Sequence, residues 1–259
     1  MIVVFGRRAR PDEDLARRAL AAVPYAVPSV EVRRLGSCLM ALGSQPDFQD
    51  GSISADGPLI AVLDGRLDNA TELRREFLTP GNGPGSPTDA DIVVAAFQRS
   101  GPLVVNRFRG AFAGAVCDGH SLWVFRDHVG FRALFYRDDA HQCVVANEAR
   151  SVLVAAELPE EPDLDVVENI FFGGQPGNIP AALKGVSRLP QGVVLTTGEK
   201  PGVKLEKYWL PRDLLETGRF TPGEARERFL ELLRQAVHRS VTGRDVLLLS
   251  GGLDSPESR

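Results

Sequence analysis

The sequence predicts an α+β fold, in which antiparallel strands and covering helices precede the start of a separate α/β domain. Alternating apolar segments are joined by the short polar turns Asp118-Gly119-His120 and Asp138-Asp139, a pattern typical of β-hairpins. Segments with helical spacing lie before and after these hairpins and would cover the faces of the sheet. Close to the C-terminus, the fully apolar segment 246–249 has the composition of a parallel strand.

The first part of the chain contains two predicted helices and two predicted strands. In order, the pattern predicts a helix over 12–23 capped by Asp12, a strand over 31–43, a loop over 46–58, a buried strand over 59–63 that stops at Asp64, and a helix over 70–77 opened by Asn69.

Hairpins dominate the second part. The pattern predicts a loop over 80–87, a helix over 91–99 behind a capping box that starts at Thr88, and hairpins over 110–126, 133–146 and 193–209. A second capping box, Thr221 with Glu224, opens a helix with one apolar face, which we expect to pack against a sheet.

Composition excludes several classes of protein. The chain has a net charge of −4, and its arginine clusters are short, so no basic stripe for nucleic acid is present. No apolar run approaches the roughly 20 residues of a membrane span. The three cysteines, Cys38, Cys117 and Cys143, are widely spaced and predict neither a disulfide framework nor a zinc site. We therefore expect a cytoplasmic protein.

A glycine-rich loop follows the last apolar strand directly. Gly251 and Gly252 allow the backbone to turn sharply and bring its N–H groups close to an anion. Ser250 and Ser255 add hydroxyl donors, and a following helix would direct its positive end at the same point. Asp254 is a candidate ligand for the Mg²⁺ that accompanies a polyphosphate. This Ser-Gly-Gly-Leu-Asp-Ser loop has the pyrophosphate-binding pattern of ATP-pyrophosphatases (PP-loop), and it predicts ATP and Mg²⁺ as cofactors.

Seven segments in the same order resemble the asparagine synthetase family. They are Asp64-Gly65-Arg66-Leu67-Asp68-Asn69 with Glu72-Leu73, Thr88-Asp89-Ala90-Asp91, the segment 108–113, the segment 126–136 that begins Arg126-Asp127, Asn147-Glu148-Ala149, the segment 185–192, and the terminal loop 250–255. Each segment is short, and the shared order makes the resemblance specific. It covers almost the whole chain from Leu59 onward.

The resemblance implies a two-domain organisation. Residues 1–210 would form an αββα Ntn-type sandwich that resembles a glutaminase, and residues 211–259 would begin an α/β ATP-pyrophosphatase domain. In this family the second domain adenylates a carboxylate substrate. By the same analogy, Leu249 would lie against the adenosine.

Three departures from the family pattern affect the first domain, and one is that the arginine segment of the family (type HRRLSI) has no clear counterpart in this sequence. Family glutaminases use a cysteine directly after the initiator methionine, with its own α-amine as base, whereas this chain has Ile2. Asp64 stands where the family has an asparagine that stabilises the oxyanion. The resemblance therefore assigns Asp64, Gly65, Arg66 and Asp89 to a vestigial glutamine pocket without a catalytic residue.

Loss of the cysteine with retention of the phosphate loop resembles the specialised branch of the family. β-Lactam synthetases, carbapenam synthetases and lasso-peptide cyclases need no ammonia, because an amine of the substrate attacks the adenylate. Within this branch, the residue sequence of the segment 64–69 is most similar to that of the lasso-peptide cyclases.

We expect the sequence to contain only the beginning of the second domain. A nucleotide domain needs on the order of 100 residues, and four residues follow Ser255. The missing synthetase domain would be supplied in cis or in trans, and the chain alone is expected to be inactive. A non-catalytic scaffold or peptide-binding module is the alternative; an Ntn hydrolase would need an N-terminal Cys, Ser or Thr exposed by processing.

Overall fold

The computed structural model describes residues 1–7, 12–25, 27–44, 51–79, 86–173, 181–214 and 220–241. The chain divides into two compact units, Met1–Leu215 and Glu216–Arg259. The expected strand over 246–249, the phosphate loop and most of the glycine-rich loop over 80–87 lie outside the described residues.

The first unit contains a six-stranded sheet built around the N-terminal strand. Its order is β10 (Ser187–Arg188), β8 (Phe135–Asp138), β9 (Cys143–Ala146), β1 (Ile2–Gly6), β3 (Cys38–Ser44) and β2 (Ser29–Leu35). All neighbouring strands in it are antiparallel. Every residue of β1 is buried, because this central strand has packed layers on both faces.

The second sheet also has six antiparallel strands. Its order is β12 (Lys204–Lys207), β11 (Val193–Thr197), β7 (Leu122–Arg126), β6 (Gly110–Cys117), β5 (Leu59–Leu67) and β4 (Gly51–Asp56). The three predicted hairpins therefore exist, two in this sheet and one in the other.

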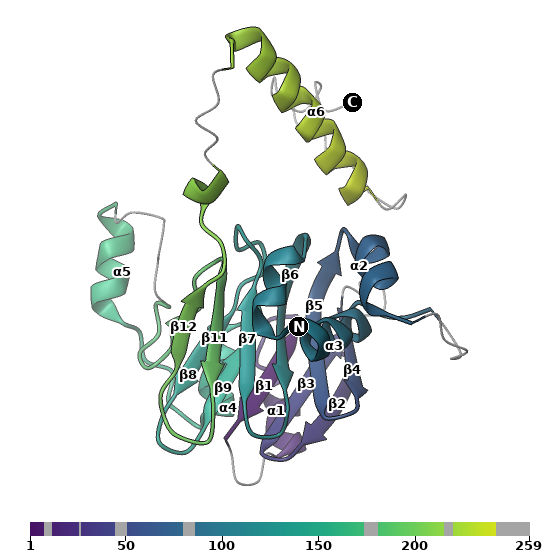
Figure 1. The fold of residues 1–259 in the computed structure, drawn as a ribbon. Helices are drawn as coiled ribbons and strands as arrows, with labels where there is room; N and C mark the ends of the chain where they lie inside the picture. The colour runs from purple at the N-terminus through teal and green to yellow at the C-terminus, as the bar shows by residue number, and fades with distance from the viewer. Residues whose placement is uncertain are drawn as a thin grey trace. The chain divides into compact units, whose positions relative to one another are not determined.

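Four layers form the first unit (Figure 1). Helices α1 (Glu13–Leu20) and α4 (Ala149–Ala155) pack on the outer face of the β1 sheet. Helices α2 (Ala70–Phe77) and α3 (Asp89–Ser100) cover the outer face of the β5 sheet. The expected αββα sandwich is confirmed.

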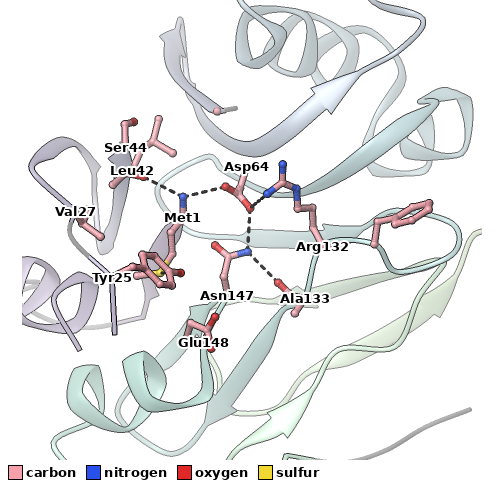
Figure 2. Close-up of a pocket in the computed structure, with 13 residues that line it drawn as sticks. Met1, Tyr25, Val27, Leu42, Ser44, Asp64, Arg132, Ala133, Asn147 and Glu148 are labelled. Atoms are coloured by element: carbon pink, nitrogen blue, oxygen red, sulfur yellow. Dashed lines mark hydrogen bonds and ion pairs between the residues drawn. The ribbon is translucent and has the colours of Figure 1, made fainter. Parts of the chain in front are cut away.

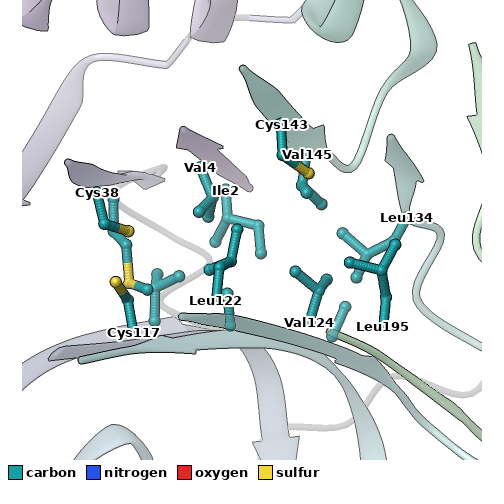
Figure 3. Close-up of a cluster of buried hydrophobic side chains, with 14 of the residues drawn as sticks. Ile2, Val4, Cys38, Cys117, Leu122, Val124, Leu134, Cys143, Val145 and Leu195 are labelled. Carbon is teal, nitrogen blue, oxygen red and sulfur yellow. The ribbon is translucent and has the colours of Figure 1, made fainter. Parts of the chain in front are cut away.

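Apolar side chains from both sheets fill the space between them (Figure 3). Ile2 and Val4 of β1 face Leu122 and Val124 of β7 across this core. All three cysteines are free and buried in the same layer, where they pack as small hydrophobic residues. Burial raises the pKa of Cys143 to about 12, so its thiol is protonated at neutral pH.

Local sequence signals determine where the helices begin. Asp12 accepts a hydrogen bond from the backbone N–H of Asp14 at the start of α1. Thr88 and Asp91 form the predicted capping box of α3. Asn69 precedes α2 as expected, but its side chain binds the backbone of Arg107 and Arg109 and does not cap the helix.

Three boundaries differ from the sequence-based prediction. The segment 31–43 is a hairpin of two strands with a turn at Gly36. The predicted loop over 46–58 is wrong from residue 51 onward, because β4 pairs with β5 along its whole length. Ser52 and Ser54 of β4 hydrogen-bond to α3, so a polar segment is satisfied inside the fold. Strand β5 continues past Asp64 to Leu67.

Among the described residues, three helical elements of the first unit and one of the second remain. They are η1 (Pro102–Arg107), α5 (Leu164–Phe171) and η3 (Pro211–Leu214) in the first unit and α6 (Pro222–Ser240) in the second. The capping box of Thr221 and Glu224 opens α6 as predicted. Its apolar residues Phe229 and Val237 are exposed, so packing of this face against a sheet stays a prediction. No helix among the described residues is long and apolar enough to cross a membrane.

Gly65, within β5, has a backbone conformation that favours glycine. Its φ is +104°, and a Cβ would lie 2.0 Å from the carbonyl oxygen of Ala111 on the paired strand. Gly65→Ala should lower the free energy of unfolding by about 2 kcal/mol or more. Chemical denaturation measures this change. Gly198→Ala is the control, since a Cβ there meets no atom within 4 Å; an equal loss in both variants would contradict the prediction.

Candidate functional site

A loop that follows β7 forms one wall of the site. The carboxylate of Asp127, which is fully buried, accepts hydrogen bonds from four backbone N–H groups, those of residues 129–132, at 2.7–3.2 Å. A carboxylate bound in this way holds the loop in a single conformation. The loop therefore presents Phe131, Arg132 and Ala133 in a defined geometry.

The neighbouring Arg126 closes the loop from the other side. Its guanidinium donates to the carbonyl oxygens of Gly130 and Arg132, both at 2.5 Å, and of Leu189 at 2.8 Å. The carbonyl of Arg126 accepts from the hydroxyl of Tyr208 at 2.6 Å. Arg126 and Asp127 therefore have a structural role, because their hydrogen bonds to the backbone shape the loop.

Beside this loop lies a cavity of about 450 Å³. Among the described residues it is lined by Met1, Tyr25, Val27, Leu42, Gly43, Ser44, Gly51, Asp64, Phe131, Arg132, Ala133, Asn147 and Glu148. Figure 2 shows these side chains converging from both sheets and from the start of α4. The volume is within the range of small-molecule sites.

A buried ion pair occupies the centre of the cavity wall. The α-ammonium of Met1 lies 2.9 Å from Oδ1 of Asp64 and donates to the carbonyl oxygen of Gly43 at 3.0 Å. Both charged groups are less than a tenth exposed. Arg132 adds a second cation, with Nη1 3.8 Å from Oδ2 of Asp64.

Asn147 connects this pair to the backbone. Its Nδ2 donates to Oδ2 of Asp64 at 3.2 Å and to the carbonyl oxygen of Ala133 at 2.9 Å. Its Oδ1 accepts from the backbone N–H of Ile2 at 2.6 Å. The amide therefore fixes the position of the first two residues relative to Asp64.

The residue that lines the cavity is Met1. Ile2, which stands at the sequence position of the family's cysteine, does not line it. Ile2 is fully buried and points into the core between the sheets (Figure 3). The described lining contains no cysteine. Each of the three cysteines is at most 2% exposed, in the core between the sheets.

The other residues assigned to the vestigial pocket lie along the end of β5 and the start of α3. Gly65, Arg66 and Asp89 are not among the described residues that line the cavity. Arg66 donates to Asp68 at 3.0 Å, and Asp89 accepts from the backbone N–H of Leu67 at 2.8 Å. Burial raises the pKa of Asp89, against the opposing effects of that hydrogen bond and of Arg74. Only Asp64 of the four contributes to the cavity.

Sequence reasoning missed most of the cavity lining. Tyr25 and Val27 come from a connection without a motif, and no sequence signal assigned Met1 to a site. Asn147 and Glu148 belonged to a family-like segment, but nothing in the sequence showed that β9 delivers them to the cavity. The proposed ATP-site residues, Leu249 to Ser255, lie outside the described residues. Among the described residues, no cluster of three His, Cys, Asp or Glu side chains could hold a metal ion.

Asp127→Asn should destabilise the domain because an amide cannot accept at both ends. Loss of one acceptor, with an N–H donor opposing the backbone N–H of Arg132, should cost about 2 kcal/mol or more. Urea denaturation measures the loss. Asp118→Asn is the matched control, since among the described residues only its Oδ1 accepts, from His120 and Ser121, and an asparagine retains that acceptor. A loss no larger than that of the control would contradict the role of Asp127.

Comparisons with known proteins agree with this architecture. The glutamine amidotransferase domain family matches residues 34–209. Asparagine synthetase (glutamine-hydrolyzing) 2 of Bacillus subtilis is 26% identical over 241 residues, which cover 86% of this chain and 31% of that protein. Amidase chry2 of Gibberella zeae is 28% identical, with 82% of this chain and 31% of that protein covered. The chain thus spans about a third of the length of these relatives.

A solved structure supports the same fold. Glutamine phosphoribosylpyrophosphate amidotransferase from B. subtilis superimposes with a TM-score of 0.56 at 14% identity, covering 81% of this chain and 49% of that chain. At this identity the likeness concerns the fold alone. The family match over residues 34–209 covers more than half of the chain, and the chain therefore belongs to the glutamine amidotransferase domain family.

Proposed function

We propose that this chain is the N-terminal portion of an ATP-dependent, AMP-forming ligase that makes amide bonds, and that its amidotransferase domain does not hydrolyse glutamine. The observation that carries the proposal is the cavity itself: an ammonium–carboxylate pair, Met1 with Asp64, stands in it, and its described lining offers no thiol. The relatives named asparagine synthetase support the ligase class.

The Met1–Asp64 pair opposes amide hydrolysis in two ways. A terminal-amine mechanism needs the α-amine to act as base, whereas the α-amine of Met1 is held by the Asp64 carboxylate at 2.9 Å and by the carbonyl oxygen of Gly43 at 3.0 Å. The carboxylate would also repel the oxyanion of a tetrahedral intermediate. A nitrogen source other than glutamine follows, such as an amine carried by the substrate, as in β-lactam synthetases and lasso-peptide cyclases.

The ligase chemistry is assigned to the C-terminal unit. In this proposal Ser250, Gly251, Gly252 and Ser255 bind the pyrophosphate of ATP, Asp254 holds Mg²⁺ and Leu249 contacts the adenosine. The rest of the synthetase domain, in cis or in trans, would bind the carboxylate substrate and the acceptor amine. We place the reaction in the cytoplasm, where ATP is available.

A second candidate function is a non-catalytic binding module. The observation in its favour is that a cavity of about 450 Å³ persists although its lining no longer provides a thiol nucleophile. The family fold would then serve as a scaffold for ligand recognition.

Purified chain incubated with L-glutamine should release glutamate no faster than a buffer blank. The reason is the absence of a thiol from the described cavity lining and the carboxylate at position 64. An enzyme-coupled glutamate assay measures the rate, with an active glutamine-hydrolysing asparagine synthetase as the positive control. Glutamate release above the blank that is lost in Asp64→Ala would refute this half of the proposal.

The ligase half is tested on a protein extended through its downstream region. With candidate carboxylic acids and Mg²⁺ it should catalyse exchange between ATP and labelled pyrophosphate. Asp254→Ala should reduce the exchange rate on the order of 100-fold or more, since it removes a proposed metal ligand. Glu199→Ala, an exposed site in the first unit, should leave the rate unchanged. No exchange with any acid tested would count against the ligase.

A further inference from the structure

Glu148 is a carboxylate of the cavity whose charge is not neutralised. It is partly buried, and it has no hydrogen-bond or ion-pair partner for its carboxylate among the described residues. It stands at the N-cap position of α4, but its side chain makes no capping hydrogen bond. The carboxylate is therefore used neither in a salt bridge nor in the helix cap.

An aromatic side chain lies on the same side of the cavity. Tyr25 is 41% exposed, and its hydroxyl donates to the sulfur of Met1 at 3.3 Å. Tyr25 and Glu148 line the same cavity, where Figure 2 shows them near one another. Burial and then the negative charges of Glu148 and Asp64 raise the pKa of Tyr25. A carboxylate beside an aromatic ring is a combination that recognises organic cations.

Within the cavity, Glu148 lies apart from the two cations, the Met1 ammonium and Arg132 (Figure 2). In Figure 2, Glu148 and Arg132 lie on opposite sides of Asn147. Arg132 lies 3.8 Å from Asp64, which is already paired with the Met1 ammonium at 2.9 Å. The two cations therefore share Asp64 at one end, and an excess of negative charge remains at the Glu148 end.

We propose that the cavity binds an ammonium or guanidinium group at the end of an apolar stem. The cation would pair with Glu148 and contact the ring of Tyr25, while Val27 and Leu42 would line the stem. Phe131, 77% exposed at the same cavity, offers an apolar surface to the rest of the ligand. Such a group occurs in free amines and in the lysine or arginine side chains of peptides.

This binding site is distinct from the ligase assignment. Its residues all belong to the first unit, whereas the proposed ATP loop belongs to the second. Loss of ligand binding without loss of pyrophosphate exchange, or the reverse, would separate the two proposals.

Isothermal titration calorimetry on the whole 259-residue chain tests the cation site. The probe is Nα-acetyl-L-lysine methylamide, and the matched control ligand is Nα-acetyl-L-norleucine methylamide, which has a similar stem without the charge. We expect binding of the lysine derivative and at least tenfold weaker binding of the norleucine derivative. Equal affinity for the two, or no binding of the lysine derivative, would overturn the proposal.

Variants locate the bound cation. Glu148→Gln should weaken binding of the lysine derivative roughly tenfold or more, and its thermal melt should match the wild type because no cap or ion pair is lost. Tyr25→Leu should weaken binding and Tyr25→Phe should retain it, since the ring supplies the contact. Glu199→Gln, at an exposed distant carboxylate, is the control. Unchanged affinity in Glu148→Gln would refute the assignment.

A second probe, pentylamine, distinguishes the source of the cation. Affinity equal to that of the lysine derivative would support recognition of the amine and its stem alone. Affinity lower by tenfold or more would support recognition of a basic side chain within a peptide, with contacts to the peptide backbone.

Discussion

The buried pair between the Met1 ammonium and the Asp64 carboxylate sets the character of the site. It joins the beginning of β1 in one sheet to β5 in the other, at the point where the cavity opens. Removing either charge from such a buried pair leaves the other one uncompensated, which is costly. The hydrogen bonds from Asn147 to Asp64 and from the Met1 ammonium to Gly43 satisfy further polar atoms. The residues around the pair are consequently constrained by it.

The fold has the framework of a glutamine amidotransferase domain. Arg126 and Asp127 still shape the loop that forms the cavity wall, through backbone hydrogen bonds that do not depend on a substrate. Position 64 carries a carboxylate, and the described lining contains no thiol. A fold is maintained by its packing and backbone hydrogen bonds, whereas an activity depends on a few side chains, so the second can change without the first.

The proposed cation site lies at one end of the cavity. The Met1 ammonium and Arg132 both lie near Asp64, whereas Glu148 lines the same cavity as the exposed ring of Tyr25. In the proposed ligase, this corner would be a recognition element separate from the proposed ATP loop, since its residues all belong to the first unit.

The sequence alone predicted α1, α2, α3, α6 and the three hairpins, since capping residues at Asp12 and Thr88 and the turn residues of the hairpins act locally. It did not predict β1, α4 or α5. Only the tertiary structure identified β4, because its polar serines are satisfied by α3, a partner more than 30 residues away. The segments that resemble the asparagine synthetase family predicted the glutaminase-like domain and identified Asp64 as a pocket residue. Strand register decided that Met1 and not Ile2 faces the cavity, since side chains alternate between the faces of a sheet and a shift of one residue exchanges them.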